Sequence, residues 1–189
     1  MDWILASASP RRKQLFKRIV RRFDVIPAKG EEKAEAWNSP SELVMMLAEQ
    51  KAREVSLLPE AQGKAVLGSD TVVVYNGEVL GKPKDEADAK RMLSMLSGRA
   101  HQVYTGVCII APNGMRAKGA ESTDVFFCRL SDEKIDKYIA SGSPMDKAGA
   151  YGIQDGGIVR RIRGSYSNVV GLPCRLVRKL KKYIEKVGQ

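Results

Sequence analysis

Two serines and two arginines follow an apolar run near the start of the chain, in a pattern that could bind phosphate. Ser7 and Ser9 offer hydroxyl groups that can donate to phosphate oxygens. Arg11 and Arg12 offer planar cations that suit the same oxygens, and a helix starting here would add unpaired backbone N–H groups. The chain contains no GxxxxGK[ST] pattern, so such a site would not be a Walker loop. The alternative interpretation is an ordinary capped helix with exposed arginines.

An aspartate interrupts an apolar run at residues 65–74, within the segment GSDTVV. Asp70 is disfavoured inside a strand and costly to bury alone, so a cation such as Mg²⁺ or a lysine is expected beside it. The alternative is a turn at the end of a strand, capped by the aspartate. Because apolar residues resume directly after Thr71, the sequence favours a functional carboxylate within the strand.

Three further polar residues are placed where they could contact a nucleotide. Lys82 stands in the segment GKPKD and could bind phosphate as a point charge, although a lysine in a turn is usually only solvated. Lys51 shares an apolar helical stripe with Leu43, and the alternative for its amine is to reach solvent. Gln154 lies in the glycine-rich segment 146–157 and offers an amide that could pair with the edge of a base.

Apolar periodicity and start signals predict helices that alternate with strands. Ser9 before Pro10 is typical of a helix start, and Ser39 with Glu42 has the spacing of a capping box. Strands are predicted over residues 3–6 and 65–74, and helices after Ser9 and Ser39, over residues 85–97, from Ser131 to about residue 140, and after Pro173. The alternation predicts an α/β class with a mixed twisted sheet flanked by helices.

The first and last helices are predicted to be amphipathic. In the first, Leu15 pairs with Ile19 and Phe16 pairs with Val20, at a spacing of four. In the last, the inward-facing residues are expected to be Leu176, Leu180 and either Tyr183 or Ile184.

Length and composition limit the class of protein. A chain of 189 residues fits a single domain spanning residues 1–189, with at most two lobes. With 43% hydrophobic residues, it can bury a sizeable core. No apolar run approaches the roughly 20 residues that cross a bilayer, and the N-terminus lacks the pattern of a secretory signal. We therefore expect a soluble, cytoplasmic protein without a membrane partner.

The net charge of +10 is concentrated near the two ends of the chain. Residues 11–22 and 160–186 are rich in lysine and arginine, which predicts either solvated helix faces or an anionic partner. A nucleic-acid partner is the weaker prediction, because the chain has no helix-turn-helix or zinc pattern and only 6% aromatic residues. A nucleotide remains the favoured anion.

Six segments occur in an order and spacing that are specific when taken together: LASASPRR, GSDTVV, GKPKDEADAKRML, YTGV, DKAGAYGIQ and GSYSNVVGLP. Over nearly the whole chain they resemble the Maf family, house-cleaning nucleoside triphosphate pyrophosphatases once described as septum-formation inhibitors. The resemblance implies a fold like that of the inosine triphosphate pyrophosphatases (Maf/Ham1), with two lobes around a cleft. It also implies hydrolysis of a nucleoside triphosphate to the monophosphate and pyrophosphate by attack of a water molecule.

The resemblance also implies roles for single residues. Asp70 corresponds to the proposed base of the family. The surroundings of the triphosphate and the metal resemble those formed here by Ser7, Ser9, Arg11, Arg12, Lys51 and Lys82. A divalent cation, Mg²⁺ or Mn²⁺, is expected between Asp70, Glu31 and the triphosphate. The family usually has an Asp-Glu pair where this chain has Gly30 and Glu31, so one of the two acidic residues is missing.

Three positions that separate substrate classes in the family are Arg11, Thr71 and Gln154 in this chain. The combination resembles the subgroup that acts on dTTP and UTP, and modified pyrimidine triphosphates belong to the same expectation. The Gln154 amide has both a donor and an acceptor, which match the imide edge of uracil or thymine. Two alternatives stay open: a pyrophosphatase of another nucleotide such as 7-methyl-GTP, or a non-catalytic nucleic-acid-binding regulator of septum formation. A homodimer is a possible assembly, because family members are often dimers.

Overall fold

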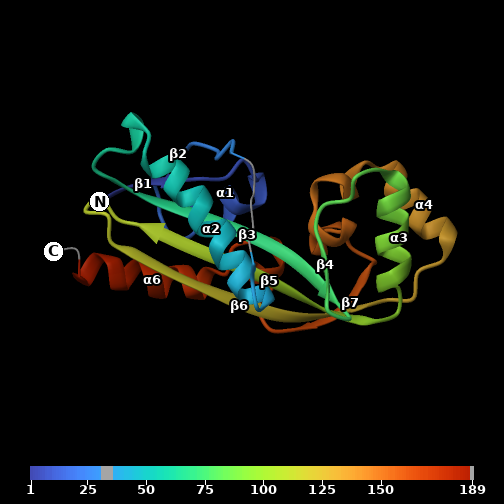
Figure 1. Ribbon diagram of the computed structural model, residues 1–189. Coiled ribbons are helices and arrows are strands. Elements are labelled where there is room, and N and C mark those ends of the chain that lie inside the picture. The colour runs from blue at the N-terminus through green and yellow to red at the C-terminus, as the bar shows by residue number, and fades with distance from the viewer. Residues whose placement is uncertain (31–35, 188–189) are drawn as a thin grey trace. The chain divides into compact units, whose positions relative to one another are not determined.

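The computed structural model describes residues 1–30 and 36–187, and Figure 1 labels its helices and strands. The strands are β1 (Asp2–Leu5), β2 (Asp24–Val25), β3 (Lys64–Tyr75), β4 (Glu78–Leu80), β5 (Ala100–Ile110), β6 (Arg116–Phe127) and β7 (Val159–Arg163). The α-helices are α1 (Pro10–Lys17), α2 (Pro40–Ser56), α3 (Glu86–Leu96), α4 (Asp132–Ala140), α5 (Tyr166–Val170) and α6 (Cys174–Val187). Short 3₁₀ helices are η1 (Pro59–Ala61), η2 (Ser143–Asp146), η3 (Ala148–Ala150) and η4 (Ile153–Asp155).

The strands of the described residues form one mixed sheet of seven strands in the order β2-β1-β3-β5-β6-β7, with β4 paired to β3. β1 is parallel to both β2 and β3, whereas β3–β4 and β6–β7 are antiparallel. The Asn76-Gly77 pair, with φ values of 49° and 80°, makes the tight turn between β3 and β4. The predicted α/β class with a mixed sheet flanked by helices is therefore confirmed.

The chain divides into two compact units that are each made of separate chain segments. Unit 1 comprises residues 1–70, 105–121 and 171–189, and unit 2 comprises residues 71–104 and 122–170. Three of the divisions fall within β3, β5 and β6, so these strands contribute residues to both units.

Unit 1 has helices on both faces of its part of the sheet. Ile4 of β1 packs in a buried cluster with Ala48 of α2. The neighbouring Trp3 must face the other way because side chains alternate along a strand, and its ring contacts Phe16 of α1 edge-on at 6.0 Å. The amine of Lys181 in α6 lies 5.9 Å from the Trp3 ring. Thus α2 covers one face of unit 1, and α1 and α6 cover the other.

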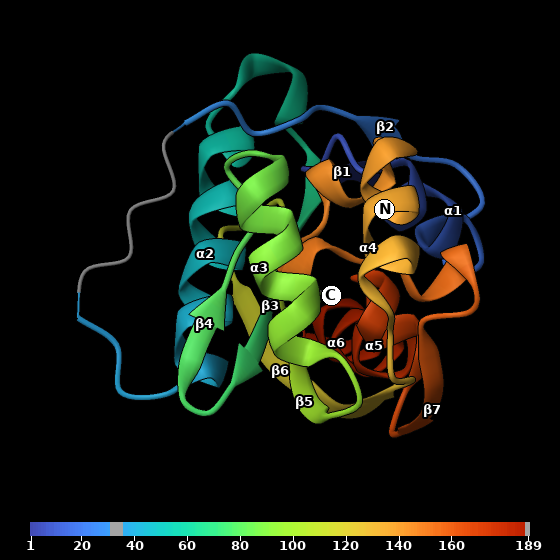
Figure 2. The ribbon, with the colours of Figure 1, turned by 90° about the vertical axis from the view of Figure 1, so that its right-hand side faces the viewer.

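The core of unit 2 forms between α3, α4 and the strand residues of that unit. Leu93 of α3, Ile135 of α4 and Val125 of β6 belong to one buried cluster, and Figure 2 shows α3 and α4 side by side. His101, Phe127 and Tyr151 add three mutual edge-on ring contacts at 4.7–5.3 Å. His101 is buried among these rings, and its Nε2 is hydrogen-bonded to Tyr151 Oη at 2.7 Å.

Most helix starts agree with the sequence signals, with one difference in detail. Ser9 accepts a hydrogen bond from the Arg12 N–H, and Ser39 accepts one from the Glu42 N–H. The Glu42 carboxylate, however, binds the backbone N–H and side-chain amide of Asn38, one residue before the expected partner.

The first and last helices each differ from the prediction in one respect. α1 ends at Lys17, so Ile19 and Val20 lie beyond it, although Val20 is buried. In α6 the buried residues are Val177 and Ile184, whereas Tyr183 is exposed. The stripe of α6 therefore runs through Ile184, and the choice of Tyr183 would have been wrong.

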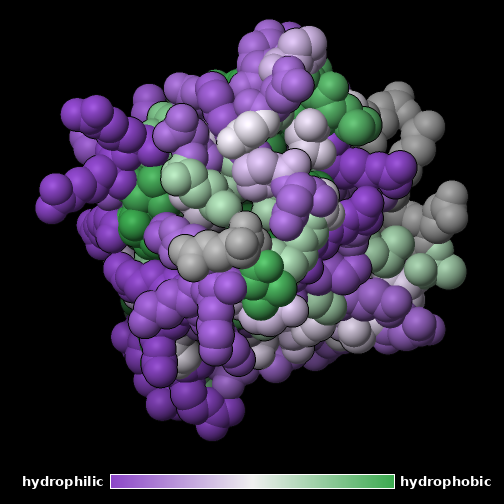
Figure 3. All heavy atoms as spheres, turned by 90° about the vertical axis from the view of Figure 1, so that its left-hand side faces the viewer, coloured by the Kyte–Doolittle hydropathy of each residue, from purple (hydrophilic) through white to green (hydrophobic). Residues whose placement is uncertain are grey.

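The basic residues of α6 are mainly on its outer side, as the solvated-face interpretation predicts. Arg175, Arg178, Lys179, Lys182 and Lys186 are all exposed. The side of unit 1 seen in Figure 3 is correspondingly mostly hydrophilic, with only small hydrophobic areas. Among the described residues, none of the helices has the length and apolar character that crossing a membrane would require.

Candidate active site

Asp70 lies inside β3 with its side chain directed at a lysine. The strand continues without a break to Tyr75, so the alternative of a capped turn is wrong. Lys51 Nζ of α2 lies 2.5 Å from Asp70 Oδ1, and the two side chains are only 16% and 9% exposed. Of the cations expected beside this carboxylate, the structure shows the lysine, and the amine of Lys51 does not simply reach solvent.

The direction of α2 across the sheet explains why Lys51 reaches this position. Residues three and four apart lie on one face of a helix, so Ala48, Lys51 and Ala52 form one stripe. Ala48 and Ala52 are fully buried and pack on the strands. A Cβ on Gly106 of β5 would stand 2.2 Å from the carbonyl oxygen of Val44, so this glycine also lets α2 lie close to the sheet. The result is a short, nearly buried ion pair.

The serines and arginines at the start of α1 form a hydrogen-bonded group. Arg12 Nη1 donates to Ser7 Oγ at 3.3 Å, and the Ser9 N–H donates to the same oxygen at 3.3 Å. Arg12 Nε donates to the carbonyl oxygen of Gly171 at 2.9 Å. Arg11 and Arg12 are half-buried, so the alternative of a capped helix with exposed arginines is only half right. The cap is present, but Arg12 is held in place.

The Gly171 carbonyl connects this group to the strand that carries Asp70. Ser69 Oγ donates to the carbonyl oxygens of Gly171 and Gly106, both at 3.0 Å, and Ser69 is fully buried. Since Ser69 and Asp70 are consecutive, their side chains point to opposite faces of the sheet. The pairing of β1 with β3 ends at Leu67, and the segment that begins at Ser7 leaves the sheet near this edge. The Ser69 hydroxyl group and the Asp70 carboxylate thus lie on consecutive residues of β3, just beyond the end of its pairing with β1.

Three predicted site residues belong to unit 2. Thr71 follows Asp70 directly in β3 and is half-buried. Lys82 is exposed between β4 and α3. Gln154 is exposed in the short turn η4. The structure thus forms two groups within unit 1, one of Ser7, Ser9 and Arg12 and one of Lys51 and Asp70. It places Thr71, Lys82 and Gln154 in unit 2.

The remaining predicted metal ligand, Glu31, lies outside the described residues. The segment just before it is tied to α2, because Glu54 Oε1 accepts from the Lys29 N–H at 2.7 Å and Oε2 accepts from the Gly30 N–H at 3.0 Å. Within residues 1–30 and 36–187, no group of three or more histidine, cysteine, aspartate or glutamate side chains could hold a metal ion. A cation would need other oxygen ligands.

Sequence reasoning missed three participants: Ser69, Gly171 and Glu54. Ser69 stood in the quoted segment GSDTVV, but only the fold shows its hydroxyl bridging residues 106 and 171. Glu54 follows Lys51 by three residues, and the helical spacing placed it on the same face. That spacing was the available signal for Glu54, whereas a bond over 102 residues of chain left none for Gly171.

Comparisons with known proteins show the family and the fold. A family model described as "Maf-like protein" matches residues 2–183. A protein of Agathobacter rectalis named "dTTP/UTP pyrophosphatase" is 50% identical, over 95% of this chain and 96% of the relative. One of the same name from Bacillus cereus is also 50% identical, over 95% and 94%. A solved HAM1 protein from Coxiella burnetii shares the fold at 15% identity, with a TM-score of 0.56 over 98% of this chain and 99% of that one.

Proposed function

The chain belongs to the Maf family, and we propose that it hydrolyses dTTP and UTP to the monophosphate and pyrophosphate. Relatives at 50% identity over nearly the whole chain carry the name "dTTP/UTP pyrophosphatase". The structural observation that carries the proposal is the buried contact of Lys51 with Asp70 inside β3. The strand carboxylate is held by a lysine, and its neighbour Ser69 shares the Gly171 carbonyl with Arg12 at the start of α1. This arrangement is suited to a polyanionic substrate.

Binding of the triphosphate is assigned to the start of α1. The partial positive charge of this helix end favours anions, and Ser7 and Ser9 add hydroxyl groups. Arg12 is already oriented by its bonds to Ser7 and Gly171, so it presents a fixed planar cation. Arg11 and Lys82 supply further positive charge to the phosphates.

We also propose that the reaction uses a divalent cation, Mg²⁺ or Mn²⁺. Mg²⁺ is commonly held by one or two carboxylates together with substrate phosphates, and Asp70 can supply one such carboxylate. Glu31 is the proposed second ligand. When bound, the cation supplies polarisation of the α-phosphorus and lowers the pKa of a coordinated water.

Asp70 is proposed to orient or deprotonate the attacking water. Lys51 fixes the carboxylate in position through Oδ1. The water attacks the α-phosphorus, the bond to the bridging oxygen breaks, and pyrophosphate leaves with its charge offset by the cations around it.

Selection of the base is assigned to Arg11, Thr71 and Gln154. The Gln154 amide is exposed and can pair with the imide edge of uracil or thymine. A cleft between two lobes, a homodimer and action on modified pyrimidines stay predictions of the same proposal.

The decisive experiment measures pyrophosphate release from dTTP and UTP by the Asp70→Asn variant in the presence of Mg²⁺. A general base contributes about 10²–10⁴-fold, so a loss of that size in kcat is expected from a protein that still folds. Retained turnover would remove Asp70 from this role. A panel of triphosphates tests the substrate: much faster cleavage of purine nucleotides or of 7-methyl-GTP would overturn the assignment to dTTP and UTP.

A further inference from the structure

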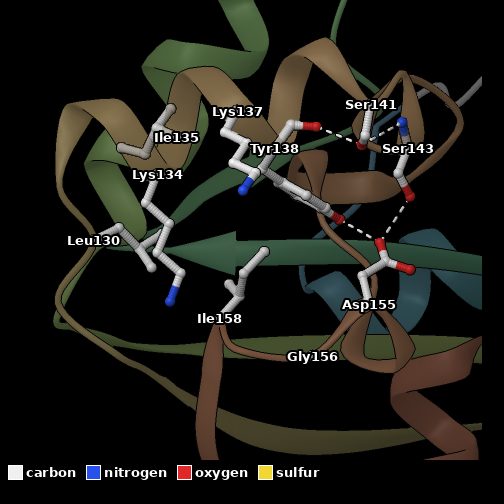
Figure 4. Close-up of a pocket in the computed structure, with 10 residues that line it drawn as sticks. All are labelled: Leu130, Lys134, Ile135, Lys137, Tyr138, Ser141, Ser143, Asp155, Gly156 and Ile158. Carbon is white, nitrogen blue, oxygen red and sulfur yellow. Dashed lines mark hydrogen bonds between the residues drawn. The ribbon is translucent and has the colours of Figure 1, made fainter.

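The turn that carries Gln154 is tied at both ends by one hydroxyl group of α4. Tyr138 Oη accepts a hydrogen bond from the Gly152 N–H at 3.0 Å and donates one to Asp155 Oδ2. Gly152 and Asp155 flank Ile153 and Gln154, so the hydroxyl closes a loop around the exposed amide. Figure 4 shows the Tyr138 ring extending from α4 toward Asp155.

A second set of contacts fixes Asp155 itself. Ser143 Oγ donates to Asp155 Oδ2 at 2.8 Å, and Lys147 Nζ lies 3.0 Å from Ser143 Oγ and 4.0 Å from Asp155 Oδ2. A Cβ on Gly152 would stand 2.8 Å from both Asp155 Oδ2 and Lys147 Cε. The turn is therefore packed closely against these two side chains.

The same face of α4 also contacts Gly157, two residues after the turn. Lys134, one helical turn before Tyr138, donates from Nζ to the carbonyl oxygen of Gly157 at 2.5 Å. Lys134, Tyr138 and Asp155 also line a pocket of about 610 Å³ in unit 2. Burial and the hydrogen bond to Asp155 raise the pKa of Tyr138, so its hydroxyl stays protonated and keeps both bonds at neutral pH.

We infer that Tyr138 is a positioning residue that sets pyrimidine selectivity by holding the Gln154 turn, an inference that rests on the proposed function. The hydroxyl does not touch the base. It holds the Gly152 backbone before Gln154 and the Asp155 carboxylate after it, and thereby the point from which the amide reaches the imide edge. Without this hydroxyl the Gln154 side chain is still present, but the backbone of its turn can move. Recognition of the correct base is then weakened more than binding of the triphosphate.

The test compares kcat/KM for UTP and ATP in Tyr138→Phe, Asp155→Ala, Gln154→Ala and the Tyr138→Phe/Gln154→Ala double variant. Tyr138→Phe and Asp155→Ala are each expected to lower the UTP-to-ATP ratio about tenfold, mainly through KM for UTP. In the Gln154→Ala background, Tyr138→Phe is expected to change the ratio no further, because its effect passes through that amide.

Ser97→Ala is the matched control. Its hydroxyl donates to the Leu130 carbonyl and accepts from the Leu130 N–H in the same unit, so it also loses two hydrogen bonds, but none to the turn. The control is expected to lose stability and keep the ratio. An unchanged ratio in folded Tyr138→Phe, or an equal loss in Ser97→Ala, overturns the inference while the proposed function stands. A wild-type protein that does not prefer UTP to ATP overturns both.

Discussion

Gly68 lies so close to α2 that a Cβ on it would stand 2.2 Å from the carbonyl oxygen of Ala48. It would also stand 2.8 Å from the Ala52 nitrogen, so both obstacles include backbone atoms that cannot rotate away. Gly68 and Asp70 are two residues apart and face the same side of the sheet. The glycine thus sets the height of α2 above the strand, and with it the reach of Lys51.

The first prediction concerns Gly68→Ala. We expect α2 to shift, the free energy of unfolding to fall by about 1–3 kcal/mol, and turnover to fall about a hundredfold as Lys51 moves from Asp70. Urea unfolding and steady-state kinetics measure the two effects. Gly119→Ala is the control, because its Cβ would meet only the flexible side chain of Leu176, at 3.0 Å. If both variants keep full activity, the close packing does not position Lys51.

The second prediction concerns the ion pair. Lys51→Met leaves the Asp70 carboxylate nearly buried without its cation, so we expect a loss of about 3 kcal/mol in unfolding free energy. Adding Asp70→Asn should recover part of it, because the uncompensated charge disappears. Lys90→Met is the matched control: its pair with Asp136 is 46% and 55% exposed, so its loss should be much the smaller of the two. Equal losses in the two lysine variants would contradict this.

The third prediction concerns the cation. Removal of divalent ions with EDTA should abolish pyrophosphate release, and Mg²⁺ or Mn²⁺ should restore it. Binding can be followed without turnover by the electron paramagnetic resonance signal of Mn²⁺ with a non-hydrolysable UTP analogue. Asp70→Asn should weaken that signal change, whereas Asp24→Asn, at an exposed pair with Lys64, should leave it unaltered. Full turnover in EDTA would exclude the metal.

The fourth prediction concerns pH and stability. Burial lowers the pKa of His101 from 6.5 to about 4, so the unfolded chain binds its proton more readily. Above about pH 6.5 the neutral His101 therefore costs no unfolding free energy. As the pH falls from there toward 4, the unfolding free energy decreases by about 3 kcal/mol in total. Unfolding of wild type and His101→Gln across this range measures it, and His101 is the single histidine in the chain. Parallel curves would show that His101 is not responsible.

Other groups that lose stability in acid do not disturb this comparison. The pKa of Glu49 is lowered by its hydrogen bond to Lys118, and that of Asp124 by its hydrogen bond to Arg163. Both contributions fall with pH in wild type and variant alike. The difference between the two proteins therefore isolates His101.

Local signals predicted the starts of elements better than their ends. Ser9 and Ser39 each cap a helix by accepting a hydrogen bond from the N–H three residues later, and this spacing can be read directly from the sequence. The end of α1 at Lys17 was not predicted, because apolar periodicity continues to Val20 while the chain leaves the helix to reach β2. Tertiary packing decides such boundaries, and periodicity alone does not describe it.

For the site, residue types were easier to predict than their partners. An aspartate in an apolar strand required a cation, and Lys51 is the one observed. The role of Gly68 could not be predicted. A glycine that allows a helix to pack closely on a strand looks like any other strand glycine until the position of α2 is known. The bonds of Tyr138 to Gly152 and Asp155 join separate elements and leave no periodic trace.

The segmented construction of unit 1 has a consequence for synthesis on the ribosome. Arg12 and Ser69, made early, both donate to the carbonyl of Gly171, and unit 1 takes its last segment from residues 171–189. While translation is under way, this segment does not yet exist, and the carbonyl that both donors require is missing. We therefore expect a nascent chain to remain catalytically silent until the segment that begins at Gly171 has emerged, so that termination before Gly171 yields no partly active enzyme.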